Sequence, residues 1–196
     1  MSTKKQVLAI LASPRKHGNV AKMLDHAMAV AEKKGYEVHF IDLYEQNIAY
    51  CKGCMRCKTL RSCYLEDDVK PIEKLLKTCD LTIMAAPTYF ANIPAPAKNL
   101  FDRLVGVIMD DNANGFPKPL LSKSHRYLLL TTCNTPFPFN LIAGQSTGCL
   151  HAMKEFFKTS GMKSLGSVTF AGTRNKTSVP NSILNQIERK IPNTNL

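Results

Sequence analysis

Two groups of residues in this 196-residue chain have the types and spacing to do chemistry. The first is the polar stretch Ser-Pro-Arg-Lys-His-Gly-Asn at residues 13–19, between an apolar run and a helical pattern. In such a connection the free N–H groups of the first helical turn and the positive end of the helix dipole face the loop. Ser13 can donate its hydroxyl, Arg15 adds charged N–H donors, and Gly18 lets the backbone come close. Residues 13–19 are therefore predicted to be a phosphate-binding loop.

The sequence of this loop limits the nucleotide that it can hold. It is not the G-x-x-x-x-G-K-[ST] loop of nucleoside-triphosphate-binding proteins, and it is not the G-x-G-x-x-G dinucleotide fingerprint. A loop made from Ser, Arg and Asn suits flavin mononucleotide (FMN) better. The alternative is a solvent-exposed turn between a strand and a helix, with ordinary capping residues.

The second group is a run of cysteines, Cys51-x2-Cys54-x2-Cys57-x5-Cys63. Four thiols so close in the sequence can surround one tetrahedral or cubane metal centre. Zinc ligands more often come as two separated pairs. Three interpretations remain open: a [4Fe–4S] cluster, a structural zinc site, and four thiols without a ligand.

A third segment, Pro-Thr-Tyr-Phe-Ala-Asn at residues 87–92, follows the apolar run at residues 81–86. The flat ring system of a flavin needs an apolar or aromatic wall and polar groups that face its nitrogens and carbonyls. Tyr89 and Phe90 can supply the wall, and Thr88, Ala91 and Asn92 can supply the polar contacts. The alternative is an ordinary connection whose aromatic side chains pack on the protein.

Residues 13–19, 87–93 and 98–103 (Lys-Asn-Leu-Phe-Asp-Arg) together resemble the flavodoxin-like NAD(P)H-dependent FMN reductases, in the expected order. The cysteine spacing resembles the compact motif of iron–sulfur flavoproteins, a branch that combines FMN with a [4Fe–4S] cluster in the same fold. The four cysteines would then be the metal ligands. The resemblance implies that the cofactor contacts are Ser13, Arg15, His17, Gly18, Asn19, Val20, Pro87, Thr88, Tyr89, Phe90, Ala91 and Asn92.

The resemblance also implies an activity. Hydride would pass from NAD(P)H to bound FMN and then to a flavin, a quinone or another small acceptor, and no residue is assigned a catalytic role because the chemistry is the cofactor's own. In the iron–sulfur branch the partner would be a redox protein such as ferredoxin. Similar proteins pair so that a neighbouring subunit helps to cover the flavin, so a homo-oligomer is expected. A non-enzymatic binding module stabilised by zinc is a third alternative.

Strand and helix patterns alternate along the chain, which predicts an α/β fold with a parallel sheet and right-handed crossovers. As in flavodoxin, the expected order is 2-1-3-4-5, with the ligand beyond the carboxyl ends of the first and third strands. Residues 43–67 are too long for an ordinary connection and are expected to be functional. Residues 131–140 are expected to form a further loop at the ligand edge, and residues 109–123 an exposed excursion. Strands are predicted at residues 7–12, 37–42, 81–86, 126–132 and 167–171, and helices at 19–34, 68–79, 95–107, 146–160 and 181–190.

Composition sets the remaining expectations. Hydrophobic residues make up 44% and charged residues 21%, which fits one globular domain over residues 1–196. The chain has no membrane-length apolar run and no apolar signal core, so a cytoplasmic location is predicted. An odd number of cysteines, seven, indicates reduced thiols. The net charge of +11 comes from basic residues that are spread along the chain without interleaved aromatics, which argues against nucleic acid as a partner.

Overall fold

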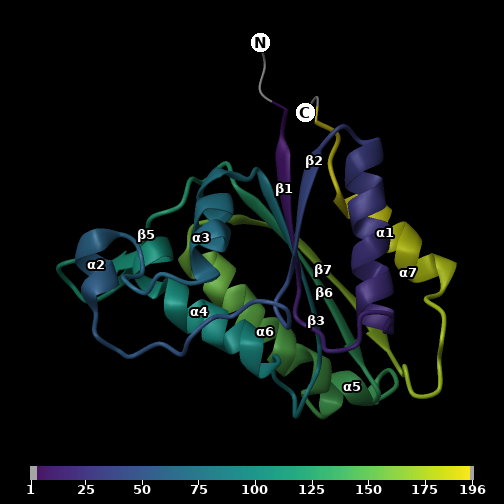
Figure 1. Cartoon of the computed structure of the whole chain (residues 1–196). Coiled ribbons are helices and arrows are strands. Elements are labelled where there is room, and N and C mark those ends of the chain that lie inside the picture. Colours follow the sequence, from purple (N-terminus) through teal and green to yellow (C-terminus); the bar gives the residue numbers. More distant parts are fainter. Residues whose placement is uncertain (1–3, 195–196) are drawn as a thin grey trace.

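The computed structural model describes residues 4–194, so the two ends of the predicted 1–196 domain lie outside the described residues. Its centre is a five-stranded parallel sheet of order β2-β1-β3-β6-β7 (Figure 1), which confirms the predicted flavodoxin-like order. The strands are β1 (Gln6–Leu11), β2 (Glu37–Asp42), β3 (Leu81–Pro87), β6 (Arg126–Cys133) and β7 (Lys163–Ala171).

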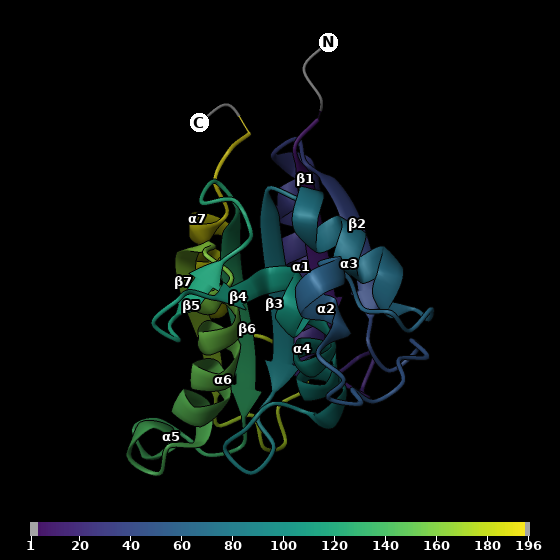
Figure 2. The same ribbon diagram turned by 90° about the vertical axis from the view of Figure 1, so that its left-hand side faces the viewer.

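Helices cover both faces of this sheet (Figures 1 and 2). Two of them, α1 (Asn19–Lys33) and α7 (Asn181–Lys190), pack on one face, and α3 (Val69–Thr78), α4 (Ala95–Ile108) and α6 (Gln145–Thr159) pack on the other. Because both faces are covered, the central strands are mostly apolar, and every residue of β3 before Pro87 is buried, Thr82 included.

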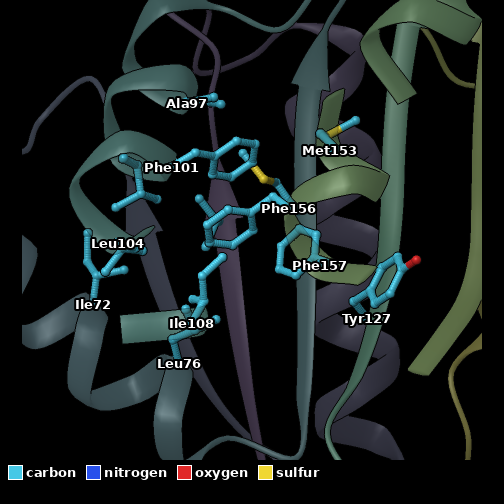
Figure 3. Packing of buried hydrophobic residues seen from close by; sticks show 14 of the residues in the cluster. Ile72, Leu76, Ala97, Phe101, Leu104, Ile108, Tyr127, Met153, Phe156 and Phe157 are labelled. Carbon is cyan, nitrogen blue, oxygen red and sulfur yellow. The ribbon is translucent and has the colours of Figure 1, made fainter. Parts of the chain in front are cut away.

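An aromatic cluster fixes α4 and α6 against the sheet (Figure 3). The rings of Phe101 and Phe156 stack with centroids 4.0 Å apart, and those of Tyr127 and Phe157 stack at 5.0 Å. Phe157 also meets Phe101 edge to face at 6.3 Å. Stacked and edge-to-face pairs add to the free energy gained by burial, so the cluster holds α4 in a defined place.

The predicted helices and strands match the structure to within one residue at each end, except that β7 begins at Lys163 instead of residue 167. The added part of β7 contains Gly166 at a φ of +99°, and its pairing with β6 shifts register between Tyr127 and Leu129. Such an irregularity interrupts the side-chain alternation that marks a strand in a sequence.

Four short elements were not predicted. The 109–123 excursion forms an antiparallel pair, β4 (Met109–Asp111) and β5 (Pro117–Pro119). The other two are short helices, α2 (Arg56–Leu60) within residues 43–67 and α5 (Phe139–Ile142) after β6. Figures 1 and 2 place α2 beside α4, apart from the loops at the carboxyl ends of the strands. Within residues 4–194 no helix has the length and apolar character to cross a lipid bilayer.

Candidate functional site

A cavity of about 520 Å³ opens at the carboxyl ends of β1 and β3. The chain leaves β1 toward α1 on one face of the sheet and leaves β3 toward α4 on the other. Two connections that diverge in this way leave a crevice between them, which is where parallel α/β sheets bind ligands. Its lining is Ser13, Arg15, His17, Gly18, Asn19, Val20, Lys22, Pro87, Thr88, Tyr89, Thr132, Cys133, Asn134, Thr173, Arg174, Asn175, Lys176 and Thr177.

The predicted phosphate-binding loop lies at the N-terminus of α1, and all six of the contact residues predicted there line the cavity. Gly18 occupies the N-cap position, no side chain caps the helix, and no acidic residue stands in the first turn. The N–H groups of that turn are therefore available to an anion. The buried Ser13 accepts a hydrogen bond from the Arg15 backbone N–H at 3.2 Å, which curls the loop. A Cβ at Gly18 would lie only 3.2 Å from the Arg15 carbonyl oxygen, so glycine suits this close turn.

The charge around the cavity is one-sided. Arg15, Lys22, Arg174 and Lys176 all contribute to the lining, and no Asp or Glu within residues 4–194 does so. A concave surface that is lined by positive charges concentrates anions. The cavity can therefore accept a phosphorylated ligand.

The turn after β3 supplies the second wall. Its Thr88 N–H donates to the Thr132 carbonyl at 2.8 Å, and Tyr89 and Asn92 exchange backbone hydrogen bonds at 3.0 and 2.9 Å. The tip residues Phe90 and Ala91 have φ angles of +49° and +57°. Of the six predicted contact residues, Pro87, Thr88 and Tyr89 line the cavity, whereas Phe90, Ala91 and Asn92 do not, and Phe90 is fully exposed.

A glycine in α6 lets this turn pack against the helix. A Cβ at Gly148 would lie 2.1 Å from the Ala91 carbonyl oxygen, a distance that neither backbone can accept without moving. The backbone of α6 therefore supports the second wall of the cavity directly.

The sequence analysis did not assign residues 173–177, which close the cavity after β7. Asn19 donates through Nδ2 to the Lys176 carbonyl at 2.8 Å, and Lys22 donates through Nζ to the Thr177 carbonyl at 2.6 Å. These bonds hold the segment against the start of α1. One sequence signal could have found it: a basic, hydroxyl-rich stretch that follows the last strand lies at the same sheet edge.

The predicted loop at residues 131–140 contributes only its first part. Thr132, Cys133 and Asn134 line the cavity. The aromatic side chains of its second part, Phe137 and Phe139, are not part of the lining and are 72% and 60% exposed. These two rings therefore face solvent rather than the cavity.

A second, smaller cavity lies in the cysteine loop, residues 43–67, and is lined by Cys51, Cys54, Cys57 and Cys63 together with Arg103 of α4. Cys51 and Cys54 are exposed, Cys57 is half-buried and Cys63 is buried. Four thiolates form the donor set of a zinc site or of a [4Fe–4S] cluster. Among the described residues, no three potential ligands are yet gathered as a metal centre. The four thiols nevertheless line the same cavity.

The other three cysteines differ from the loop cysteines. Cys79, Cys133 and Cys149 are buried, and all seven cysteines of the chain are free thiols. Burial raises the pKa of the Cys79 thiol to about 12 and also raises the pKa values of Cys133 and Cys149. A thiol with a raised pKa stays mostly neutral, which lowers its reactivity. Cys79 and Cys149 are fully buried and pack in the core, whereas Cys133 also lines the larger cavity.

Comparisons with known proteins find relatives of this chain among iron–sulfur flavoproteins. The chain is 37% identical over 100 residues to an iron–sulfur flavoprotein of Archaeoglobus fulgidus and 36% identical over 100 residues to one of Methanosarcina thermophila. These alignments cover 51% of this chain and 46% and 52% of the two relatives, so the chain spans about half the length of the curated relatives it matches.

Among solved structures, an FMN-dependent NADH-azoreductase of Bacillus anthracis, determined in complex with FMN, superposes with a TM-score of 0.71. The superposition covers 95% of each chain at 15% sequence identity, which shows a common fold. The model of the NADPH-dependent FMN reductase family matches residues 6–124, more than half of the sequence. This match includes the phosphate-binding loop, the turn after β3 and the cysteine loop, and the chain belongs to the NADPH-dependent FMN reductase family.

Proposed function

We propose that this chain binds one FMN in the cavity between β1 and β3 and oxidises NAD(P)H, passing electrons to a flavin, a quinone or another small acceptor. One observation carries the proposal: an uncapped helix N-terminus and an aromatic wall at Tyr89 face the same cationic cavity. The first suits a phosphate group and the second suits a flat ring.

The residues of the chain bind and orient the cofactor in this proposal. Ser13, Arg15 and the first turn of α1 hold the phosphate, and Pro87, Thr88 and Tyr89 lie against the ring. Arg174 and Lys176 from the other side add positive charge for a phosphorylated co-substrate. When bound, FMN supplies the hydride chemistry, so the protein has to position two ligands and exclude water.

A second candidate is an iron–sulfur flavoprotein that passes single electrons from FMN through a cluster to a redox protein such as ferredoxin. The observation that favours it is that all four cysteines of the loop line one cavity beside α4. The names of the relatives from Archaeoglobus and Methanosarcina support the same reading.

One experiment tests both candidates. A visible absorption spectrum is recorded on protein purified without oxygen, and iron, zinc and acid-labile sulfide are assayed on the same sample. Flavin bands with sulfide and iron support the electron carrier, and flavin bands alone support the reductase. Protein that is colourless and does not bind added FMN contradicts the main proposal, and zinc in such protein supports a binding module.

Turnover separates the two flavin-containing candidates further. A reductase oxidises NADH or NADPH rapidly with an artificial acceptor, whereas an electron carrier does so slowly. Parallel assays with both nicotinamides then identify the preferred donor.

We further propose that the protein forms a homo-oligomer that covers the flavin. Large apolar side chains in the segments that follow β3 and β6 are exposed, among them Phe90 at 102%, Phe137 at 72% and, at the end of α5, Ile142 at 78%. Exposed apolar groups that gather in one region are typical of an interface. Light scattering of the FMN-bound protein at increasing concentration tests this, and a monomer throughout contradicts it.

A further inference from the structure

The cysteine loop is joined to α4 by one buried side chain. Arg103 is 1% exposed, and it donates through Nη1 to the Ala49 carbonyl at 2.6 Å and to the Asp67 carboxylate at 2.7 Å. Through Nη2 it donates to the Leu65 carbonyl at 3.4 Å and again to Asp67 at 3.0 Å. Because Ala49 precedes the first cysteine of the loop and Leu65 follows the last, this single guanidinium holds both ends of the cysteine segment.

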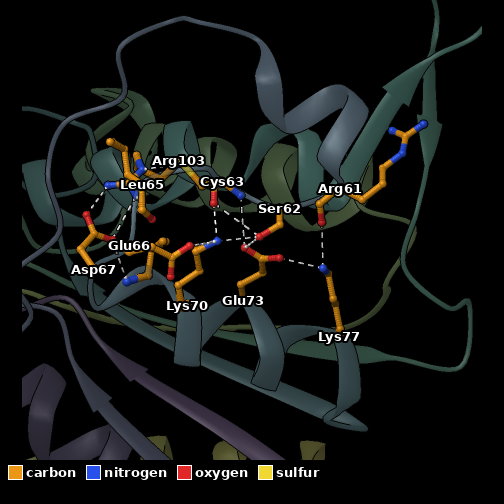
Figure 4. Close-up of polar contacts among 11 residues, drawn as sticks. Arg61, Ser62, Cys63, Leu65, Glu66, Asp67, Lys70, Glu73, Lys77 and Arg103 are labelled. Atoms are coloured by element: carbon orange, nitrogen blue, oxygen red, sulfur yellow. Dashed lines mark hydrogen bonds and ion pairs between the residues drawn. The ribbon is translucent and has the colours of Figure 1, made fainter.

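The remaining donor of Arg103 reaches a cysteine. Its Nε–H donates to the Cys63 sulfur at 3.2 Å (Figure 4). A guanidinium has five N–H donors in a fixed plane, and here all its contacts go to the cysteine loop. The position of the Cys63 sulfur is thereby coupled to the position of the loop ends.

The backbone at Cys63 is held from the opposite side by α3 (Figure 4). The buried Glu73 carboxylate accepts hydrogen bonds from the Ser62 hydroxyl at 3.1 Å and from the Cys63 N–H at 3.4 Å. Lys70 donates to the Ser62 hydroxyl at 2.9 Å and to the Cys63 carbonyl. Cys63 is therefore fixed through its backbone by α3 and through its sulfur by α4.

A second residue of α4 is fitted to the same loop. Gly106 lies three positions after Arg103 and thus on the same face of the helix. A Cβ at Gly106 would lie 2.5 Å from the Cys57 carbonyl carbon and 2.7 Å from the Cys57 sulfur. The missing side chain at Gly106 therefore leaves room for Cys57, while Arg103 donates to Cys63. The contact at Gly106 does not depend on Arg103.

We propose that Arg103 is a positioning residue of the four-cysteine site. It fixes the ends of the loop so that the thiols face one cavity, and its Nε–H donates to the Cys63 sulfur. When the four cysteines hold an iron–sulfur cluster, this hydrogen bond makes the cluster easier to reduce, because donors to the sulfur ligands raise the potential. The part that concerns the cluster rests on the second candidate function, whereas the ordering of the loop does not.

The first test uses the metal-free protein and measures hydrogen exchange of the backbone amides at residues 49–67. Arg103→Met is expected to speed exchange in this segment by about tenfold or more, since it removes the bonds that close the segment. Cys63 should also be alkylated faster. Lys98→Met is the matched control, because Lys98 is a cation of the same helix that pairs with Asp102 at the surface. Unchanged exchange at residues 49–67 in Arg103→Met overturns the proposal.

The second test uses the cluster-loaded protein and measures the midpoint potential by titration followed by electron paramagnetic resonance. Arg103→Lys keeps the charge but cannot reach all the partners, so it also serves if Arg103→Met does not fold. We expect fewer irons per chain and a more negative potential. If a variant holds a full cluster with the same midpoint potential as the unmodified protein, the proposed effect of the hydrogen bond to Cys63 is wrong. If the unmodified protein holds no iron or sulfide, the second candidate function and the cluster part of the proposal both fail, and hydrogen exchange alone decides the ordering of the loop.

Discussion

The phosphate-binding loop and the cysteine loop are two sites built in opposite ways. The first is short and lies between a buried strand and the first turn of α1, whose backbone N–H groups are its main donors. The second spans residues 43–67 and contains one five-residue helix, α2, none of whose residues is buried. Its candidate metal ligands are four cysteine side chains, and two of these are exposed.

This difference shows which residues hold each site in a defined structure. A site at the end of regular elements is formed as soon as the sheet and its helices pack. A site on a long loop takes its order from residues outside it, here from α3 and α4. The two sites should therefore respond to different substitutions, and each prediction below tests that separation.

The largest expected difference is in thiol reactivity. In the metal-free protein a thiol reagent should label Cys51 and Cys54 first and Cys57 next. Cys63 and Cys133, which are buried but line cavities, should follow slowly, and Cys79 and Cys149 should stay unlabelled until unfolding. For Cys79 the rise in pKa from 9.0 to about 12 alone slows labelling about a thousandfold, because the thiolate is the reactive form. Mass spectrometry of timed samples measures this, and rapid labelling of all seven would mean that the core is not formed.

Next in size is a charge reversal in the phosphate-binding loop. Arg15→Glu should weaken FMN binding by about 100-fold, or about 3 kcal/mol, because it replaces a charged donor by a repelling carboxylate. Lys16→Glu makes the same change of charge on a neighbouring side chain that pairs with Glu45 and does not line the cavity. Its effect should be small at physiological salt. Fluorescence titration with FMN compares the two variants, and equal affinities would refute the assigned loop.

Two helical glycines test the separation directly. Gly106→Ala and Gly148→Ala each place a Cβ within 2.7 Å of backbone atoms, so each should destabilise the fold by about 1–3 kcal/mol instead of stabilising its helix. Gly106→Ala should displace Cys57 and lower metal binding while FMN affinity stays the same. Gly148→Ala should displace the turn after β3 and lower FMN affinity while metal binding stays the same. Paired FMN and zinc titrations decide, and the same losses in both variants would mean that the sites are coupled.

The smallest expected effect is a dependence of stability on pH at the Arg103–Asp67 pair. Burial raises the pKa of Asp67, but hydrogen bonds from Arg103, Ala49 and Val69 lower it further than burial raises it, so the net pKa lies below 3.8. A carboxyl group with a lowered pKa in the folded state stabilises the fold above its unfolded pKa and loses that contribution as pH falls. Asp67→Asn should cost about 1–2 kcal/mol near neutrality.

That cost should shrink as the pH falls from about 5 through the ordinary Asp pKa of about 3.9 and below it, because the unfolded chain takes up the proton before the folded Asp67 does. Urea unfolding of both proteins across this range measures it. A difference that stays constant with pH would show that the charge of Asp67 does not stabilise the folded state.

The sequence predicted most of the fold because the main elements carry strong local patterns. The buried strand β3 is apolar apart from Thr82, and α1 has apolar residues at the spacing of one helix face. Both patterns can be read without tertiary context. The short elements lack such patterns. For α2, the flanking residues Met55 and Arg61 both have positive φ angles, and the helix is too short for any periodicity. For β5, two prolines argue against a strand.

For the site, the sequence located the residues that follow a strand directly and missed those that depend on long-range contacts. Ser13 and Thr88 stand at strand ends and could be read from the chain alone. Arg103 belongs to a segment that supported the resemblance, yet its burial depends on Asp67, which lies 36 positions earlier. No local pattern contains that pairing, and the same holds for the bond between Asn19 and Lys176, 157 positions apart.

The uncapped start of α1 has a consequence for handling the protein. Free N–H groups at a helix N-terminus bind a phosphate ester, inorganic phosphate and sulfate by the same hydrogen bonds, so they distinguish poorly among these anions. An anion that binds only the folded state raises the apparent stability by mass action. Buffers that contain these salts should therefore raise the melting temperature of the flavin-free protein and compete with FMN, so that affinities measured in them will come out too weak.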